Sequence, residues 1–222
     1  MYDFNFTPVF AGMDHLWLGA WLTIRLSGMA MIIGLVVSVI CAGAKTSGIR
    51  PLRWVVDAYV EVIRNTPFLV QIFFFYFGLP SLGLRLDPNQ AALLALVVNF
   101  GAYGTEIIRA GIESIDHGQI EAGRALGLRP LQIFRHVIMK PALRTVYPSL
   151  TSQFIYLMLT SSVVSVISAN DLAAAGNDLQ SQTFASFEVY LVVTAIYLAM
   201  SIGFSMLFAL IGQAAFKYPL SR

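Results

Sequence analysis

The sequence predicts an all-α polytopic membrane protein in which residues 1–222 form a single transmembrane domain. Three observations support this fold class. The chain is 57% hydrophobic and only 12% charged, which is too apolar for an ordinary soluble domain. Several blocks exceed the roughly 18 apolar residues that signal a transmembrane helix. Basic residues also gather in alternate segments between these blocks, as they do in membrane proteins.

Five transmembrane helices are expected, at residues 16–44, 54–79, 88–112, 145–167 and 187–216. With a rise of about 1.5 Å per residue, each is long enough for a hydrocarbon core of about 30 Å with some tilt. The N-terminal segment before the first span contains acidic residues but no Lys or Arg, so no removable signal peptide is expected. The single cysteine, Cys41, lies inside an apolar run, so an intrachain disulfide is excluded.

The distribution of basic residues predicts the orientation of the chain in the membrane. Two connecting segments and the C-terminus are basic: Lys45, Arg50, Arg53, Arg109, Arg124, Arg129, Arg135, Lys140, Arg144, Lys217 and Arg222. The N-terminal segment and the 168–186 loop have no basic residue, and the 81–89 loop has Arg85 alone. We therefore expect the N-terminus outside, the C-terminus inside and a cytoplasmic loop at residues 113–141.

This cytoplasmic loop contains the longest polar interval, DHGQIEAGRALGLRPLQIFRHVIMKP, which predicts two short helices. Asp116 with Gln119 three residues later is a variant of the capping box, so the first helix should begin just after Asp116. Gly127 suits its C′ position, because glycine takes the left-handed conformation without a Cβ penalty. Pro130 suits the first turn of the second helix.

Small residues recur at helical spacing in the first of these helices and leave one side nearly bare: Gly118, Ala122 and Ala125, with Gly123 beside them. Glu121 and Arg124 project from neighbouring positions. Such a helix suits a groove in another protein; the alternative is a loop helix that lies on the membrane. The second helix is expected to present an interfacial apolar face made of Leu131, Phe134, Val137 and Ile138.

Polar residues interrupt the second span. Asp57, Glu61 and Arg64 fall on one helical face, and Asn65-Thr66-Pro67 breaks the helix after them. Charges inside a membrane are costly, so they normally pair or face protein. One interpretation is a structural ion-pair stripe around a proline kink. The other is a hinge that lines an inner gate, with these candidate residues: Glu61, Arg64, Asn65, Thr66 and Pro67.

The third and fourth spans contain candidate substrate contacts. Asn99 and Tyr103 lie one turn apart and would present an amide and a phenol to a water-filled cavity, or would serve helix packing instead. Gly101 and Gly104 on the same span allow a neighbouring backbone to approach closely. Thr160 and Ser161 are further candidates in the fourth span, although such hydroxyls often bond back to their own helix.

Several kinds of chemistry are absent from the pattern. The chain has no G-x-x-x-x-G-K-[ST] phosphate loop, so it is not expected to hydrolyse ATP. Its histidines are widely separated, and no acidic cluster has metal-ligand spacing. No nucleophile has an adjacent base. We therefore expect no enzyme, no metal site, no cofactor bound by this chain and no nucleic-acid partner.

Three motifs resemble those of a known family. Glu121-Ala122-Gly123, then Gly127 and later Val137-Ile138-Met139, is similar to the EAA loop of ABC-importer permeases. Two runs resemble the polar amino-acid branch of that family, Tyr59 to Gln71 and Asn99 to Ile112. The sequence departs from the family in three places. Gly123 replaces an alanine, Lys140 stands where a proline is typical, and Leu159-Thr160 replaces a Lys-Asp pair.

The resemblance implies an ABC type I importer permease in the bacterial inner membrane, with a periplasmic N-terminus and a cytoplasmic C-terminus. It implies a second permease subunit (identical or homologous), two ATP-binding subunits that hold ATP and Mg, and a periplasmic amino-acid-binding protein. Residues expected to couple to the ATPase are Gly118, Glu121, Ala122, Gly123, Arg124, Ala125 and Gly127. An ion-gradient-driven secondary transporter or channel is the alternative, and would use Asp57, Glu61 and Glu106 as ion or proton sites.

Overall fold

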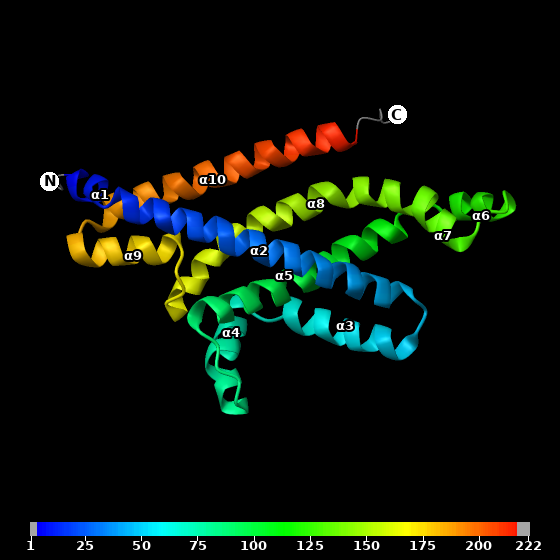
Figure 1. Ribbon diagram of the computed structural model, residues 1–222, viewed down its shortest axis with the longest axis horizontal. Helices are drawn as coiled ribbons and strands as arrows, with labels where there is room; N and C mark the ends of the chain where they lie inside the picture. The colour runs from blue at the N-terminus through cyan, green and yellow to red at the C-terminus, as the bar shows by residue number, and fades with distance from the viewer. Residues whose placement is uncertain (1–3, 217–222) are drawn as a thin grey trace.

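Four long helices run along the main axis of the molecule (Figure 1), in a computed structural model that describes residues 4–216. They are α2 (Met13–Thr46), α5 (Pro88–Glu113), α8 (Met139–Thr160) and α10 (Ser186–Ala215). At one end lie α1 (Thr7–Ala11) and α9 (Leu172–Thr183), and at the other α6 (His117–Ala125) and α7 (Pro130–Ile133). Every regular element among the described residues is helical, which confirms the predicted fold class. Lys217 and Arg222, used above for orientation, lie outside the described residues.

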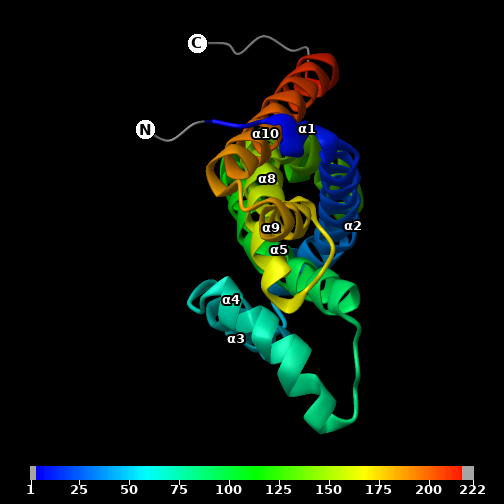
Figure 2. The ribbon, with the colours of Figure 1, turned by 90° about the vertical axis from the view of Figure 1, so that its left-hand side faces the viewer.

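Within residues 4–216, four helices are long and apolar enough to cross a membrane: Met13–Thr46, Pro88–Glu113, Pro130–Ile167 and Ser186–Ala215. A fifth span is present if Arg50–Arg64 and Phe68–Leu82 count together, although these two are bent by 109°. The pair corresponds to α3 (Arg50–Arg64), then α4 (Phe68–Phe73), a π turn (Phe74–Gly78) and a 3₁₀ turn (Leu79–Leu82). The expected kink is therefore a sharp break, and α4 points away from the bundle axis (Figures 1 and 2).

The break occurs at Asn65-Thr66-Pro67 because the side chains there satisfy the last turn of α3. The Asn65 amide donates to the carbonyl of Glu61 at 2.9 Å, and the Thr66 hydroxyl donates to that of Val62 at 2.8 Å. Pro67 has an extended backbone and lacks the N–H that a continuing helix needs. The chain therefore leaves the axis of α3 at this point.

The prediction of two short loop helices is right for the first and wrong for the second. α7 begins at Pro130, passes through a π turn at Phe134–Ile138 and continues into α8, so Pro130–Ile167 is one helix of 38 residues. Pro141 does not end this helix, although it lacks a backbone N–H. The π turn just before it changes the hydrogen-bond register, so the helix continues past the proline. Leu131 and Phe134 of the expected interfacial face are exposed, at 76% and 45%, while Ile133 between them is buried.

Close helix approaches hold the bundle together, as the glycines predict. A Cβ at Gly104 would lie 2.2 Å from the Ser38 hydroxyl, and one at Gly101 would lie 2.9 Å from a methyl of Val37. On another side of α5, a Cβ at Gly111 would meet a Val146 methyl at 2.0 Å. α5 therefore packs directly against α2 and α8, and side chains larger than hydrogen at these positions would force the helices apart.

A buried carboxyl group fastens α9 to the bundle at the end far from α6. Asp171, 1% exposed, caps α9 by accepting from the Ala174 N–H at 2.8 Å, and it also accepts from the Tyr197 hydroxyl at 3.3 Å. Next to it, the Leu172 N–H donates to the Thr23 hydroxyl of α2 at 3.0 Å. Burial raises the pKa of Asp171 to about 6, above its ordinary value of 3.8.

This raised pKa predicts a pH dependence of stability. In the unfolded chain Asp171 ionises near its ordinary pKa, so the folded state binds more protons between about pH 4 and pH 6. The contribution of Asp171 to stability should therefore fall as pH rises through this window and stay constant above it. Asp171→Asn keeps an N-cap acceptor and should remove that slope. The melting temperature of both proteins in detergent from pH 4.5 to 7.5 checks this; parallel curves would contradict it.

Candidate functional site

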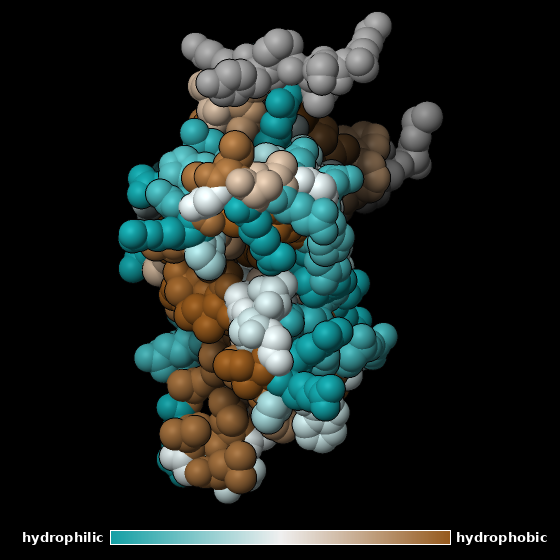
Figure 3. Space-filling model, turned by 90° about the vertical axis from the view of Figure 1, so that its right-hand side faces the viewer, coloured by the Kyte–Doolittle hydropathy of each residue, from teal (hydrophilic) through white to brown (hydrophobic). Residues whose placement is uncertain are grey.

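The first candidate site is α6, which stands at the end of the molecule shown in Figure 3 among mostly hydrophilic residues. The Asp116 carboxylate accepts from the Gly118 N–H at 2.6 Å and so begins the helix where the sequence predicts. Gly127 ends it with a φ of 73°, the left-handed value expected for a C′ glycine. The Leu128 N–H then donates to the Gly123 carbonyl at 3.1 Å and the Gly127 N–H to the Arg124 carbonyl at 2.9 Å, which completes a Schellman motif.

One face of α6 packs on the long helix and the other is free. Gly123 is buried, and a Cβ there would lie 3.3 Å from a side-chain carbon of Ile133. The remaining predicted coupling residues are exposed: Gly118, Glu121, Ala122, Arg124, Ala125 and Gly127. Gly123 therefore serves the internal contact, while the small residues and Glu121 form a compact exposed surface. The cap, the Schellman motif and this contact together fix the direction of α6.

The second candidate site surrounds the break between α3 and α4, and Gln71 is at its centre. The buried Gln71 amide nitrogen lies within hydrogen-bond distance of three oxygens at the end of α3: 2.7 Å to the Ile63 carbonyl, and 3.1 and 3.0 Å to the carbonyl and hydroxyl of Thr66. Its carbonyl oxygen accepts from the Asn99 amide of α5 at 3.0 Å. Gln71 thus links both sides of the break to the third predicted span.

The structure brings one gate candidate, Arg64, and two substrate-path candidates, Asn99 and Tyr103, together at α5. Asn99 is buried against Gln71, and one turn later the guanidinium of Arg64 lies 5.4 Å from the ring centroid of Tyr103. In the fourth span, the buried hydroxyl of Ser161 donates to the Met158 carbonyl at 2.7 Å, and Thr160 is half-buried at the end of α8. Ser161 therefore bonds back to its own helix.

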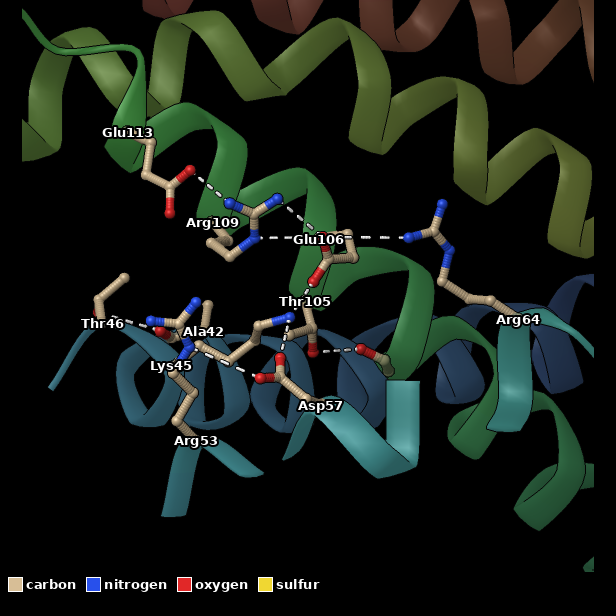
Figure 4. Close-up of polar contacts among 11 residues, drawn as sticks. Ala42, Lys45, Thr46, Arg53, Asp57, Arg64, Thr105, Glu106, Arg109 and Glu113 are labelled. Carbon is tan, nitrogen blue, oxygen red and sulfur yellow. Dashed lines mark hydrogen bonds and ion pairs between the residues drawn. The ribbon is translucent and has the colours of Figure 1, made fainter. Parts of the chain in front are cut away.

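A network of ion pairs joins α2, α3 and α5 near their basic ends (Figure 4). The ammonium of Lys45 lies 2.7 Å from a carboxylate oxygen of Asp57 and 2.5 Å from one of Glu106. Arg109 and Arg64 approach the other oxygen of Glu106, at 2.9 and 4.0 Å. Two charged residues of the predicted stripe, Asp57 and Arg64, therefore pair with residues of neighbouring helices. The third, Glu61, accepts from the Asn65 amide at 2.8 Å.

The three carboxylates that an ion-driven transporter would use as ion or proton sites already have partners within this chain. Asp57 and Glu106 are each paired with basic groups, and Glu61 bonds locally. Within residues 4–216, no group of three or more His, Cys, Asp or Glu residues is arranged to hold a metal ion.

Sequence reasoning assigned no role to Gln71 or Lys45 in these sites. Gln71 carried a signal, because it is the one amide in the apolar run from Phe68 to Phe77. Lys45 was used only for orientation, although a lysine at the end of a long apolar helix needs a partner when that end is packed.

Comparisons with known proteins agree with this geometry. The family described as "Binding-protein-dependent transport system inner membrane component" matches residues 9–217. The probable glutamine ABC transporter permease protein GlnM of Bacillus subtilis (strain 168) is 39% identical over 202 residues, which cover 91% of this chain and 90% of that relative. The L-cystine transport system permease protein TcyB of the same strain is 39% identical over 168 residues, which cover 76% of this chain and 69% of that relative.

A solved structure is also similar. The structure described as "Crystal structure of an amino acid ABC transporter with histidines" superposes on this chain with a TM-score of 0.90 and is 36% identical in sequence. The match covers 96% of this chain and 100% of that one. The family match covers nearly the whole sequence, and the similarity extends to the fold. The chain therefore belongs to the family of binding-protein-dependent transport system inner membrane components, the permease subunits of ABC importers.

Proposed function

We propose that this permease moves polar amino acids or related zwitterions from the periplasm to the cytoplasm by alternating access. Two of its relatives are named as glutamine and L-cystine permeases, which supports this substrate class. Two permease subunits would form the path, with two ATP-binding subunits below and a periplasmic binding protein above. ATP and Mg would be bound by the ATP-binding subunits. The family match and the paired carboxylates disfavour the ion-gradient alternative.

The observation that carries this proposal is the geometry of α6. A membrane subunit without an ATP site must receive force through a contact, and that contact must be compact, exposed and rigidly held. α6 meets these conditions: its exposed side carries small residues and Glu121, and its buried side fits Gly123 against Ile133. We infer that α6 enters a groove of the ATP-binding subunit, with Glu121 meeting a basic or hydrogen-bonding partner there.

The α3–α4 break supplies the moving part of the mechanism. Gln71 and Asn99 fasten the break to α5, and Arg64 lies over Tyr103 on the same face. We infer that these contacts form the inner gate and change between the inward and outward states. We keep Asn99, Tyr103 and Thr160 as candidate contacts along the path, whereas Ser161 at the end of α8 is fully buried and donates to the Met158 carbonyl, which favours a packing role. Hinges of this kind consist of a few residues at the ends of helices, and the φ and ψ angles of these residues change during the movement.

Reconstitution tests this function directly. The permease is purified with its ATP-binding subunits, placed in proteoliposomes with the binding protein, and supplied with labelled glutamine, cystine, arginine or a neutral sugar. We expect uptake of at least one amino acid, and ATP hydrolysis that the loaded binding protein stimulates. Uptake that continues without ATP but stops when an ion gradient is dissipated would overturn the proposal.

The proposed orientation has its own test. In a Cys41→Ser background, single cysteines are placed at the exposed positions Ser47 and Ser181, on opposite ends of the bundle. An impermeant thiol reagent added outside intact cells should label Ser181→Cys and leave Ser47→Cys unmodified until the cells are broken. Labelling of Ser47→Cys from outside would reverse the orientation.

A further inference from the structure

An apolar groove runs between α2, α5, α8 and α10, toward the end of the bundle that we propose is cytoplasmic. Its volume is about 630 Å³. On α2 it is lined by a stripe at nearly regular helical spacing: Met31, Leu35, Val39, Gly43 and Thr46. At 1.5 Å per residue this stripe is about 22 Å long, more than the roughly 15 Å of one leaflet of the hydrocarbon core. The groove is therefore long enough for a whole acyl chain.

A polar cavity of about 560 Å³ continues the groove at its basic end. Thr46 lines both cavities, and the polar one is also lined by Lys45, Gly48, Arg53, Arg109 and Glu113. In the ion-pair network around it (Figure 4), four basic side chains meet three carboxylates, which leaves one positive charge: Lys45, Arg53, Arg64 and Arg109 against Asp57, Glu106 and Glu113.

Arg53 is the basic residue best placed to meet a ligand. Its side chain is 66% exposed, and its nearest carboxylate contact is 3.6 Å from Asp57, so its guanidinium keeps donors for another anion. The next residue, Trp54, is 77% exposed, as aromatic residues are at the membrane–water interface. This places the cavity at the level of lipid headgroups.

We propose that the groove and the cavity together bind one anionic phospholipid of the inner leaflet. An acyl chain lies along the α2 stripe, and the phosphate lies against Arg53. Because surrounding lipid is as apolar as the groove, the groove positions the chain and the charged cavity supplies the selectivity. The positive charge left in the adjoining cavity favours a ligand with an anionic head over an apolar helix of a second permease.

Binding to the purified transporter complex tests the proposal by native mass spectrometry, with phosphatidylglycerol and phosphatidylcholine of identical chains as probes. Gly43 lines the groove, and a Cβ there meets no atom within 4 Å, so Gly43→Phe fills the groove without a clash at its base. Gly28→Phe is the matched control, because Gly28 is equally open on the same helix but does not line the groove. Arg53→Gln is paired with Arg50→Gln, an exposed arginine outside the cavity.

We expect Gly43→Phe to weaken the binding of both lipids at least tenfold. Arg53→Gln should weaken phosphatidylglycerol at least tenfold and leave phosphatidylcholine unchanged, and both control variants should bind as the parent does. Equal binding by all variants would mean that the lipid is only part of the surrounding bilayer and would overturn the proposal. Separation of the two permease subunits by Gly43→Phe alone would also overturn it, since the groove would then be a subunit interface.

Discussion

Replacing Gly127 by valine is expected to abolish recruitment of the ATP-binding subunit while leaving the permease in the membrane. Gly127 has a φ of 73°, where a branched side chain costs about 1–2 kcal/mol. No atom lies within 4 Å of a Cβ built there, so the effect is conformational and not a clash. Relief of the strain would break the Schellman hydrogen bonds to Gly123 and Arg124 and turn α6 away from its direction.

The controls for this experiment use the same backbone geometry. Gly127→Asn should retain recruitment, because asparagine tolerates the left-handed conformation. Gly83→Val introduces the same strain at a φ of 86° in the loop between the α4 segment and α5, away from α6 (Figure 1), and should also retain recruitment. Glu121→Lys should lose it through charge repulsion, with no change in the backbone. Pull-down of the ATP-binding subunit and uptake are measured in the same cells. Normal recruitment by both Gly127→Val and Glu121→Lys would mean that α6 is not the coupling element.

Gln71→Leu is expected to reduce uptake at least tenfold while ATP hydrolysis continues without its dependence on the loaded binding protein. The substitution removes the amide that joins the end of α3 to Asn99, and so leaves the Ile63 and Thr66 carbonyls and the Asn99 amide without this partner. The Asn99 amide is buried, and a buried polar group left unpaired costs about 1–3 kcal/mol. The break would then move independently of α5, and ATP hydrolysis by the ATP-binding subunits would no longer drive the gate.

A double-mutant cycle with Asn99→Leu separates this coupling from general damage. If the two amides act together, the double variant should be impaired less than the sum of the single variants, by about 0.5–3 kcal/mol in melting or transport free energy. Additive effects, with normal stimulation of hydrolysis in Gln71→Leu, would assign both amides to packing alone.

Local chemistry was predictable from the sequence, and long-range geometry was not. The start and end of α6 follow from Asp116 and Gly127, because a cap and a left-handed glycine depend on a few neighbouring residues. The close approaches at Gly101 and Gly104 were also correct, since small residues on an apolar helix indicate contact wherever the partner lies.

The remaining features depend on partners far away in the chain. Pro67 predicts that a helix stops, but the 109° bend is held by Gln71 and Asn99, which are 28 residues apart. Lys45 pairs with Glu106, 61 residues later, only because α2 and α5 pack side by side. The continuity of α7 with α8 was missed because Lys140-Pro141 is typical of a helix end, and a π turn is not evident from residue type.

The unbroken helix from Pro130 to Ile167 has a mechanical consequence. At 1.5 Å per residue its 38 residues extend about 57 Å, nearly twice the hydrocarbon core. One end touches α6 through Ile133, and the 3₁₀ segment Ser161–Ile167 at the other end packs against α4 and α5. A tilt applied at the α6 end, which we propose meets the ATP-binding subunit, would therefore displace the opposite end of the helix most. The bending stiffness of this helix, more than any single contact, would determine how far a movement at the α6 end displaces the other end.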